Sequence, residues 1–401
     1  MSESDRPGYP PAGPAFPPGG YRPPPRPPRN PLLTILLCAA VILGLVIGAG
    51  QTAWQTTSLL SSLWGHSAAP PPAHVWSASS GPVDASALDT GVVDIDTQLG
   101  YQNAVGAGTG IVLSPSGDVL TNNHVVNGAT SIRATDVGTG RSYPVTVVGY
   151  DRSHDIAVLK LQGASGLPTA SIGDSSTVAV GDPVAAVGNA GGVGGRPSVA
   201  LGTVSALHRT ITASDGNGGS AQRLTGLIQV TANVQPGDSG GPLVNTAGQV
   251  VGIDTAATTG FRFESTRGQG FAVPINDAIA IAKQIQSGSD SPAIHVGPTG
   301  VLGIAVQDSD ALPYLGPWSR FGTTSSGVTV VGVLQDSPAE QAGLATGDII
   351  VAVDHKAIDS ASTLTSVLDR HHPGDSVGIT WIDRSGQQQD ATVHLAPGPP
   401  S

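Results

Sequence analysis

The sequence predicts an all-β main domain followed by a smaller domain that mixes strands and helices. Between Gly91 and Ile253 short apolar runs alternate with turn residues, as where GIVL precedes SPSG, and helical stretches are few. Many short strands at close spacing are typical of a β-sandwich or β-barrel. A convincing helical pattern comes later, where apolar residues recur at helical spacing from Ile275 to Ile285 and stop at Gly288.

The sequence pattern changes at residues 297–398, and this change predicts a second domain. Strand-like runs extend from Val328 to Leu334 and from Gly347 to Asp354. Between them, Ser337-Pro338-Ala339-Glu340 has the spacing of a capping box with proline at the first helical position, which predicts a helix start. Ser362 to Arg370 can form a second helix. We therefore expect strands and short helices in this domain.

The N-terminal part has a different composition. Residues 1–30 are rich in proline, contain Arg22, Arg26 and Arg29, and have almost no large aliphatic side chains. Such a segment cannot bury a core, so we expect a disordered tail. Residues 54–87 are rich in serine, alanine and proline and predict a linker.

An uncharged apolar run from Leu32 to Gly50 is long enough to cross the ~30 Å hydrocarbon core as a helix. The arginines precede this run, so the positive-inside rule places the N-terminus in the cytoplasm and the later residues outside. We expect an uncleaved, single-pass membrane anchor at 31–53 and extracytoplasmic domains. A cleaved signal peptide is the alternative, although the apolar run is long for one.

Charge and cysteine content narrow the possibilities further. The formal net charge is −11, which argues against an electrostatically driven nucleic-acid partner. The single cysteine, Cys38, lies inside the apolar run, so the later residues cannot form a disulfide. Their stability must come from core burial, which a domain of this size can supply.

The stretch from Gln235 to Pro242, QPGDSGGP, has the composition of a nucleophile turn. Ser239 lies among glycines, which allow sharp turns and let backbone N–H groups approach a bound group closely. Acyl transfer requires two such N–H groups as an oxyanion hole. The candidate donors are the amides of Gly237 and Ser239.

A serine hydroxyl is a poor nucleophile near neutral pH without a base and a group that orients the base. Upstream, TNNHVV contains His124 and HDIAVLKL contains Asp155, each beside a strand-like run. The order His124, Asp155, Ser239 is that of chymotrypsin-type proteases and differs from the orders in subtilisins and α/β-hydrolases. An isolated histidine or aspartate would be a structural residue, but the three motifs together favour a catalytic triad.

Together with GFAVPIN at 270–276, these motifs resemble the HtrA/DegP family of trypsin-like serine proteases, in particular exported actinobacterial members with a PDZ domain. The resemblance extends from about Val83 to the C-terminus and four motifs occur in the family's order. It implies a chymotrypsin-like double β-barrel over 88–290, with the active site in the cleft between two six-stranded barrels. The first barrel would supply His124 and Asp155, and the second would supply Ser239.

The same resemblance implies a serine endopeptidase that acts on unfolded or damaged envelope proteins and needs no metal or cofactor. HtrA proteases commonly form trimers, although no residue pattern here establishes a homotrimer. A chaperone or a PDZ-based sensor with latent or minor proteolysis is the alternative, because the sequence does not show whether the oxyanion loop is competent.

The phrases GVLGI and DSPAEQAGLATGDIIVAVD resemble a PDZ domain. In PDZ domains a glycine-containing loop captures a terminal carboxylate with backbone N–H groups, and the peptide adds as a strand to a sheet edge. The resemblance assigns this role to the amides of Leu302, Gly303 and Ile304. It implies C-terminal peptide tails as partners and regulation of the protease by the PDZ domain.

The substrate pocket is also assigned by resemblance. Asn233, Val234, Ile253 and Thr255 are expected to line the S1 pocket, and Asn233 takes the position where trypsin has an acid. We therefore expect small or medium apolar P1 residues. Asp238 departs from the family, which more often has asparagine there, and it is expected to accept local backbone hydrogen bonds.

The pair His371-His372 could suggest a metal site. Adjacent histidines rarely make a closed site, and no further Cys or His ligands accompany them in the sequence. We therefore expect solvated loop histidines.

Overall fold

A computed structural model describes residues 88–215, 222–255, 261–263, 269–308 and 327–400. The predicted tail, anchor and linker lie outside these ranges. Within them, no helix combines the length and the apolar character needed to cross a membrane. The anchor at 31–53 therefore stays a prediction.

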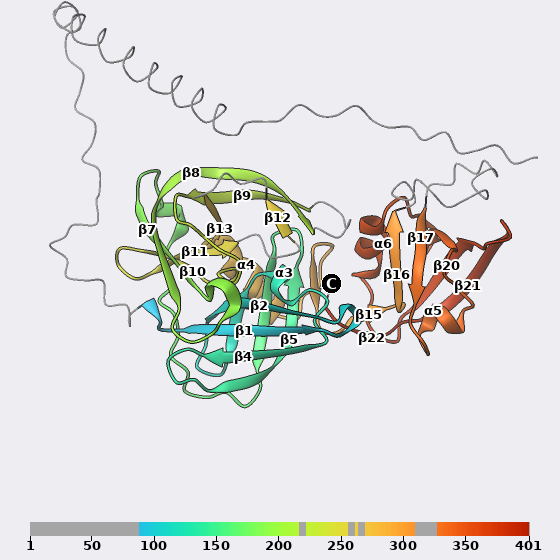
Figure 1. Ribbon diagram of the computed structural model, residues 1–401, viewed down its shortest axis with the longest axis horizontal. Helices are drawn as coiled ribbons and strands as arrows, with labels where there is room; N and C mark the ends of the chain where they lie inside the picture. Colours follow the sequence, from blue (N-terminus) through green and yellow to red (C-terminus); the bar gives the residue numbers. More distant parts are fainter. Residues whose placement is uncertain (1–87, 216–221, 256–260, 264–268, 309–326, 401) are drawn as a thin grey trace, which may run out of the picture. The chain divides into compact units, whose positions relative to one another are not determined.

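The first seven-stranded sheet closes into a ring of six strands with one strand added at β5 (Figure 1). The ring order is β5-β4-β1-β2-β3-β6, and pairing of β5 with β6 completes it. The added strand, β14, continues the sheet beyond β5. The strands are β1 (Val92–Leu99), β2 (Ala104–Val112), β3 (Asp118–Thr121), β4 (Ser131–Asp136), β5 (Ser142–Asp151), β6 (Ile156–Leu161) and β14 (Ile294–Val296).

The second seven-stranded sheet repeats this plan. Its ring order is β8-β7-β10-β11-β13-β9, pairing of β8 with β9 closes it, and β12 adds beside β8. The predicted all-β character of this domain is confirmed. The strands are β7 (Pro183–Gly188), β8 (Ser198–Asp215), β9 (Gln222–Val230), β10 (Pro242–Asn245), β11 (Val250–Thr255), β12 (Phe261–Phe263) and β13 (Gly270–Pro274).

A hydrophobic cluster shared by the two barrels joins them. Ile111 and Ile156 of the first barrel pack in it with Ile253 of the second barrel. Two other clusters each consist of residues from one barrel. Burying a large aliphatic side chain stabilises the fold by about 1.5–3 kcal/mol, so the shared cluster ties the barrels together substantially.

Most helical segments of this domain are single turns, and α4 is the longest of those described. The helices are α3 (Asn123–Val126), α4 (Ile275–Gln286) and the 3-10 turns η1 (Gly100–Gln102), η2 (Ser175–Thr177) and η3 (Ala190–Gly192). The predicted long helix is confirmed as α4, which buries Ile275, Ala278 and Ile285 and is followed by Gly288 at a φ of 73°. The expected strand end at His124 is instead the one-turn helix α3.

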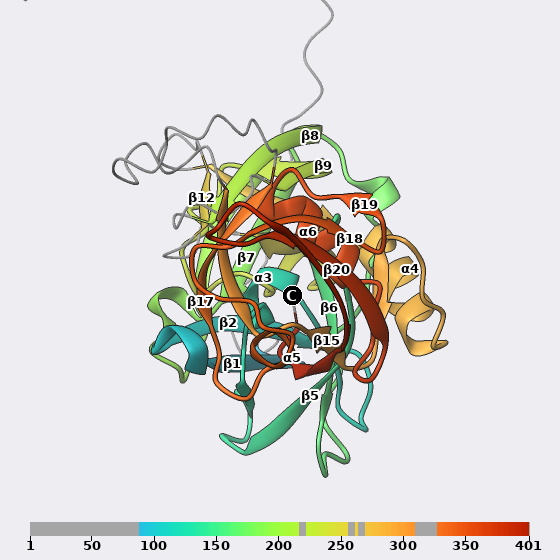
Figure 2. The same ribbon diagram turned by 90° about the vertical axis from the view of Figure 1, so that its right-hand side faces the viewer.

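The second domain is a β-sheet with two short helices (Figure 2). Its sheet order is β16-β17-β18-β20-β21, β19 pairs with β18, and β15 pairs separately with β22. Its own hydrophobic cluster includes Val330, Leu364 and Trp381. The elements are β15 (Thr299–Val301), β16 (Ile304–Asp308), β17 (Val328–Val333), α5 (Pro338–Gln341), β18 (Ile349–Val353), β19 (Lys356–Ala357), α6 (Ala361–Leu368), β20 (Ser376–Ile382), β21 (Gln388–His394) and β22 (Ala396–Gly398).

The predicted capping motif begins α5. The Ser337 hydroxyl accepts the N–H of Glu340 at 3.2 Å, and the Glu340 carboxylate accepts the N–H of Asp336 at 2.6 Å. The reciprocal bond therefore reaches one residue before the expected N-cap. The bond to Ser337 satisfies a backbone donor that the helix start leaves without an intrahelical partner, and the bond to Glu340 satisfies the N–H of the residue before the N-cap.

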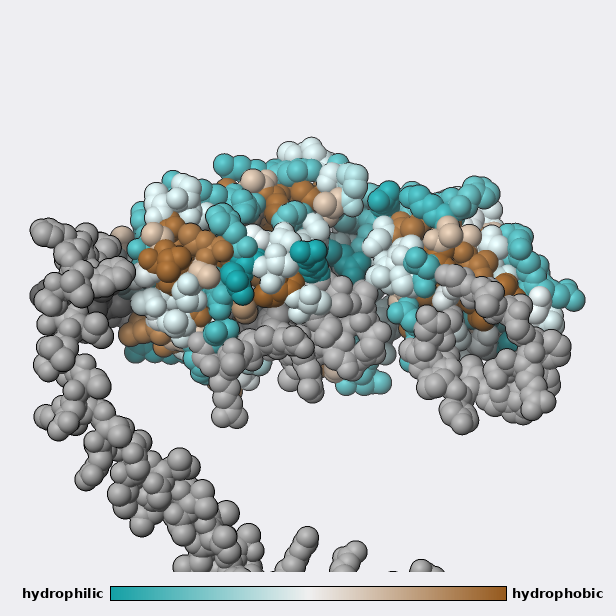
Figure 3. Space-filling view, turned by 90° about the horizontal axis from the view of Figure 1, so that it is seen from above, coloured by the Kyte–Doolittle hydropathy of each residue, from teal (hydrophilic) through white to brown (hydrophobic). Residues whose placement is uncertain are grey.

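The described surface mixes polar residues with apolar areas, as Figure 3 shows for one face. Exposed apolar side chains include Tyr101, Val105, Val180 and Leu201. Scattered exposure of this kind is normal for a folded domain.

We predict that Ile156→Ala lowers the free energy of unfolding by about 2–5 kcal/mol, because Ile156 is 0% exposed in the shared cluster. Urea unfolding in a Ser239→Ala background, which removes the predicted nucleophile, measures this change. Val180→Ala is the matched control, because Val180 is 62% exposed and its loss should change stability by less than about 0.5 kcal/mol. Equal effects of the two substitutions would contradict the role given to the shared cluster.

Candidate active site

His124 and Asp155 form a buried hydrogen-bonded pair. The His124 ring Nδ1 lies 2.8 Å from Asp155 Oδ2, and the backbone N–H of His124 donates to Asp155 Oδ1 at 2.9 Å. The two side chains are 3% and 1% exposed. A proton on Nδ1 leaves Nε2 as the nitrogen that can accept a proton, so the pair has the geometry of an oriented base.

The backbone around Asp155 is held in an unusual conformation. Asp155 has a φ of 57° and precedes β6 directly. The Asn122 side chain donates from Nδ2 to the Asp155 carbonyl at 2.9 Å. Asn122 itself is the N-cap residue immediately before α3, which carries His124. One local network therefore orients both the aspartate and the helix that carries the histidine.

Thr255 completes the surroundings of this carboxylate. Its hydroxyl donates to Asp155 Oδ2 at 3.1 Å. Thr255 is buried and ends β11 of the second barrel. A residue predicted for the S1 pocket thus places its hydroxyl on Asp155, where it helps to hold the carboxylate beside the His124 ring.

The Ser239 turn is bonded to strand β2 of the first barrel. Thr109 donates its N–H to the Ser239 carbonyl at 2.8 Å and its hydroxyl to the Gly237 carbonyl at 2.8 Å. Gly240 packs too closely against the first barrel for any side chain. A Cβ at this position would lie 2.1 Å from the Thr109 carbonyl oxygen and 2.2 Å from Thr121 Oγ1. Thr121 ends the strand just before the helix of His124. The structure therefore brings the serine turn against the segment that carries the histidine.

The candidate oxyanion loop is held by Asp238. Its Oδ2 accepts the N–H of Gln235 at 2.8 Å, and its Oδ1 accepts the Ser198 hydroxyl at 2.9 Å. The prediction that Asp238 accepts a local backbone hydrogen bond is confirmed. Burial raises the pKa of Asp238, while the bonds from Gln235 and Ser198 act in the opposite direction.

Gly237 approaches the loop at Asn189 too closely for any side chain. Its φ is 99°, and a Cβ would lie 2.0 Å from the Asn189 carbonyl oxygen. The N–H of Gly191 donates to the Pro236 carbonyl at 2.7 Å in the same region. Glycine at 237 is therefore required by packing as well as by backbone conformation.

The predicted pocket residues do not share one environment. Asn233 is exposed and Val234 is partly buried, but Ile253 is 0% exposed in the cluster that joins the barrels. The expectation that Ile253 lines an open pocket is therefore wrong, because its side chain fills the core. On strand β11 the following side chain, Asp254, points to the opposite face.

Asp254 is a buried acid that the sequence analysis did not select. Its side chain is 0% exposed, and neither carboxyl oxygen has a well-formed hydrogen bond among the described residues. Burial, followed by the negative charge of Asp238, raises the pKa of Asp254 well above its ordinary value, with a smaller opposing effect from the backbone of Val187. A charged residue inside the apolar run VVGIDT was the available sequence signal.

Hydrogen bonds fix two carbonyl groups of the candidate peptide-binding loop in the second domain. The Leu302 carbonyl accepts the N–H of Ala339 at 3.0 Å, and the Gly303 carbonyl accepts the N–H of Leu334 at 2.9 Å. In a trans peptide the next N–H points away from the preceding carbonyl. The N–H groups of Gly303 and Ile304 therefore point away from these partners.

The sheet next to this loop has an open side. Within the described residues, β16 pairs only with β17 and forms one end of the sheet order. An edge strand offers unpaired backbone groups to an added strand. The loop and the edge thus fit the predicted mode of peptide binding.

Comparison with known proteins supports this two-domain organisation. Residues 108–253 match the trypsin-like peptidase domain family, and residues 300–395 match the PDZ domain family. The first match includes His124, Asp155 and Ser239.

Two similar proteins are named as serine proteases, and one of them also has the HtrA name. The chain is 36% identical over 321 residues to serine protease PepD of Mycobacterium tuberculosis, covering 76% of this chain and 63% of that protein. It is 34% identical over 296 residues to the serine protease Do-like HtrA of Lactococcus lactis subsp. cremoris, covering 72% of this chain and 70% of that protein. The chain therefore spans just under two thirds of PepD and somewhat more of the Lactococcus protein.

We predict that Asp254→Asn changes how stability depends on pH. A carboxyl whose pKa is raised by folding stabilises the folded state below its unfolded pKa, and this contribution is lost as the pH rises through the folded pKa. Asparagine does not titrate, so the Tm of the variant relative to the parent should increase as the pH is raised above about pH 4. Thermal unfolding in the Ser239→Ala background measures this difference, and parallel pH profiles would contradict the raised pKa.

Proposed function

Because this chain belongs to the HtrA-type serine proteases, we propose that this serine endopeptidase is membrane-anchored and cleaves unfolded or damaged proteins of the cell envelope. The observation that carries the serine-endopeptidase activity is the buried His124–Asp155 pair on the segment against which the Ser239 turn is bonded. The names of its relatives describe serine proteases. The substrate class rests on family membership.

In the proposed mechanism Ser239 attacks the carbonyl carbon of the scissile peptide bond. His124 Nε2 accepts the serine proton and then delivers it to the leaving amine. Asp155 keeps the ring oriented and stabilises its charged form, and Thr255 donates a hydrogen bond to that carboxylate. The products of this step are an acyl-enzyme and a free amine.

Hydrolysis of the acyl-enzyme completes the cycle. A water molecule gives its proton to His124 Nε2 and attacks the ester carbonyl, and Ser239 regains its proton as it leaves. The amides of Gly237 and Ser239 are the proposed donors to the oxyanion in both steps. Asp238 supports them by bonding Gln235 and Ser198.

The PDZ domain is proposed to capture C-terminal tails and to regulate the protease. The outward N–H groups of Gly303 and Ile304 and the edge of β16 support this role. A bound tail can alter proteolysis only if it favours one conformation of the protease.

The remaining proposals rest on sequence and family. The apolar run within 31–53 would hold the chain in the membrane with the protease and PDZ domains outside the cytoplasm. A homotrimer is proposed from family membership alone.

We predict that the wild-type protein cleaves casein and reacts with a fluorophosphonate probe, whereas Ser239→Ala does neither. Loss of the nucleophile should reduce turnover by at least about 10³-fold. Ser205→Ala is the matched control, because Ser205 is an exposed serine of β8 and should keep both activities. A folded wild-type protein without cleavage or labelling would instead favour the chaperone or sensor alternative.

We predict that a peptide with a free, apolar C-terminus binds the Ser239→Ala protein at least about 10-fold more tightly than its C-terminal amide. Amidation removes the negative charge, and hydrogen bonds to a charged group contribute about 1.5–3 kcal/mol. Fluorescence anisotropy of the two labelled peptides measures the ratio. Equal affinities would exclude carboxylate capture by the loop at Leu302.

A further inference from the structure

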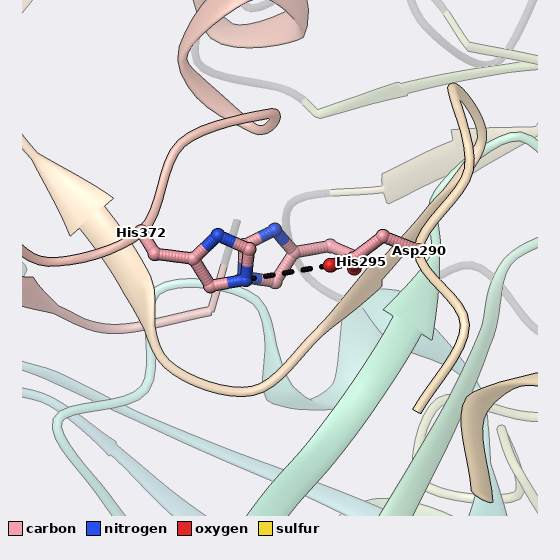
Figure 4. Close-up of side chains that lie close together, drawn as sticks. All are labelled: Asp290, His295 and His372. Carbon is pink, nitrogen blue, oxygen red and sulfur yellow. Dashed lines mark ion pairs between the residues drawn. The ribbon is translucent and has the colours of Figure 1, made fainter. Parts of the chain in front are cut away.

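Two histidines and an aspartate from separate parts of the chain meet beside strand β14. Asp290 lies between α4 and β14, His295 lies within β14, and His372 follows α6 of the PDZ domain. One ligand atom from each lies within 4.8 Å of the others, and Figure 4 shows the three side chains together. The expectation that no further Cys or His accompanies His372 is wrong in one respect, because folding brings His295 beside it.

Both ring nitrogens of His295 lie close to backbone carbonyl oxygens. Its Nδ1 lies 2.7 Å from the Asp369 carbonyl oxygen, and its Nε2 lies 3.1 Å from the Pro298 carbonyl oxygen. The residue is 4% exposed. A neutral imidazole has one N–H, so it can donate to one of these carbonyls but not to both. With the proton on Nδ1, the lone pair of Nε2 faces an oxygen, which is unfavourable unless a cation or a second proton is present.

The other two side chains place a ring nitrogen and a carboxylate oxygen at the same place. His372 Nε2 lies 2.9 Å from the Val296 carbonyl oxygen and 3.7 Å from Asp290 Oδ2. The other oxygen of Asp290, Oδ1, accepts the N–H of Val296 at 2.7 Å. That bond orients the carboxylate and leaves Oδ2 directed to His372, as shown by the dashed line in Figure 4.

Ring stacking holds the two imidazoles in place. The rings of His295 and His372 are 4.7 Å apart between centroids, and His295 also stacks on Tyr150 at 5.1 Å. Two stacked rings are a poor arrangement for two positive charges, because like charges at this distance repel. A single cation shared by the nitrogens and the carboxylate satisfies the same atoms without placing a charge on both rings.

We propose that Asp290, His295 and His372 form a binding site for a divalent transition-metal ion of the zinc type. Imidazole nitrogens and a carboxylate oxygen are ligands that Zn²⁺ accepts, and water can complete a tetrahedral set. Calcium and magnesium are disfavoured, because these ions prefer oxygen ligands throughout. The Nδ1 bond from His295 to a backbone carbonyl is the usual outer contact of a metal-binding histidine.

Metal binding requires a modest local closure. Zn–N bonds of about 2.0–2.1 Å place two ligand atoms of a tetrahedral ion about 3.3 Å apart. The three ligand atoms are within 4.8 Å of one another, so they move together by about 1 Å when the ion binds. The exposed carboxylate of Asp290 and the partly exposed ring of His372 allow this movement.

The site joins the segment after the protease domain to the PDZ domain. Two direct contacts already lie at this junction, since Arg152 pairs with Asp369 at 2.8 Å and the Tyr150 hydroxyl bonds Thr299 at 3.2 Å. None of the three proposed ligands belongs to the proposed catalytic residues. The metal therefore has a structural role, in which it clamps the PDZ domain to β14 and so to the protease barrel.

Zinc binding to the full chain carrying Ser239→Ala, purified metal-free in detergent, tests the proposal. Equilibrium dialysis with metal analysis should find one Zn²⁺ per chain, with affinity reduced on the order of 100-fold by His372→Ala. His371→Ala is the matched control. Its ring lies next in sequence but pairs with Asp354 and Asp375, so its removal should leave the affinity within about 3-fold. His372→Gln gives a second variant that retains a donor for the Val296 carbonyl if the alanine variant is misfolded.

A second readout tests the clamp itself. Zn²⁺ should slow cleavage within 287–298 by subtilisin, a protease without a catalytic metal, several-fold in the parent and His371→Ala proteins, and it should have no such effect in His372→Ala. No zinc binding to the folded parent would overturn the proposal. Equal binding by all variants would also overturn it, because the chain contains 10 histidines that can bind metal adventitiously.

Discussion

The active-site arrangement depends on the hydrogen bonds through which Thr109 of the first barrel holds the serine turn of the second. Its N–H and its hydroxyl bond the carbonyls of Ser239 and Gly237, each at 2.8 Å. Close approach is possible because Gly240 has no side chain. Since His124 and Asp155 belong to the first barrel, any shift between the barrels would move the nucleophile relative to its base. The shared hydrophobic cluster around Ile156 opposes such a shift.

Buried carboxyls near this arrangement lower its stability at neutral pH. Burial raises the pKa of Asp94 to about 6, although the N–H of Gly195 bonds its Oδ2 at 3.0 Å. Asp254 and Asp238 add two more acids with raised pKa values in the second barrel. Perturbed acids of this kind cluster at functional sites, where local strain is compensated by the surrounding fold. The core of two closed barrels supplies that compensation here.

The junction between the protease and PDZ domains includes several polar contacts. Contacts there include the Arg152–Asp369 ion pair, stacked imidazole rings and hydrogen bonds to backbone carbonyls. Polar contacts of this kind respond to protons and metal ions more strongly than a buried apolar surface does. A domain held in this way can change its attachment without unfolding, which suits a module proposed to regulate its neighbour.

Local patterns in the sequence determined the all-β class, helix α4, the start of α5 and the motifs around His124, Asp155 and Ser239, because these features depend on neighbouring residues. Tertiary structure alone decided which distant groups meet. It placed the Thr255 hydroxyl on Asp155, turned Ile253 into the core and left Asp254 buried on the opposite face of the same strand. It also brought His372 to His295, because a contact between residues far apart in the chain is set by packing and leaves no signal in local spacing.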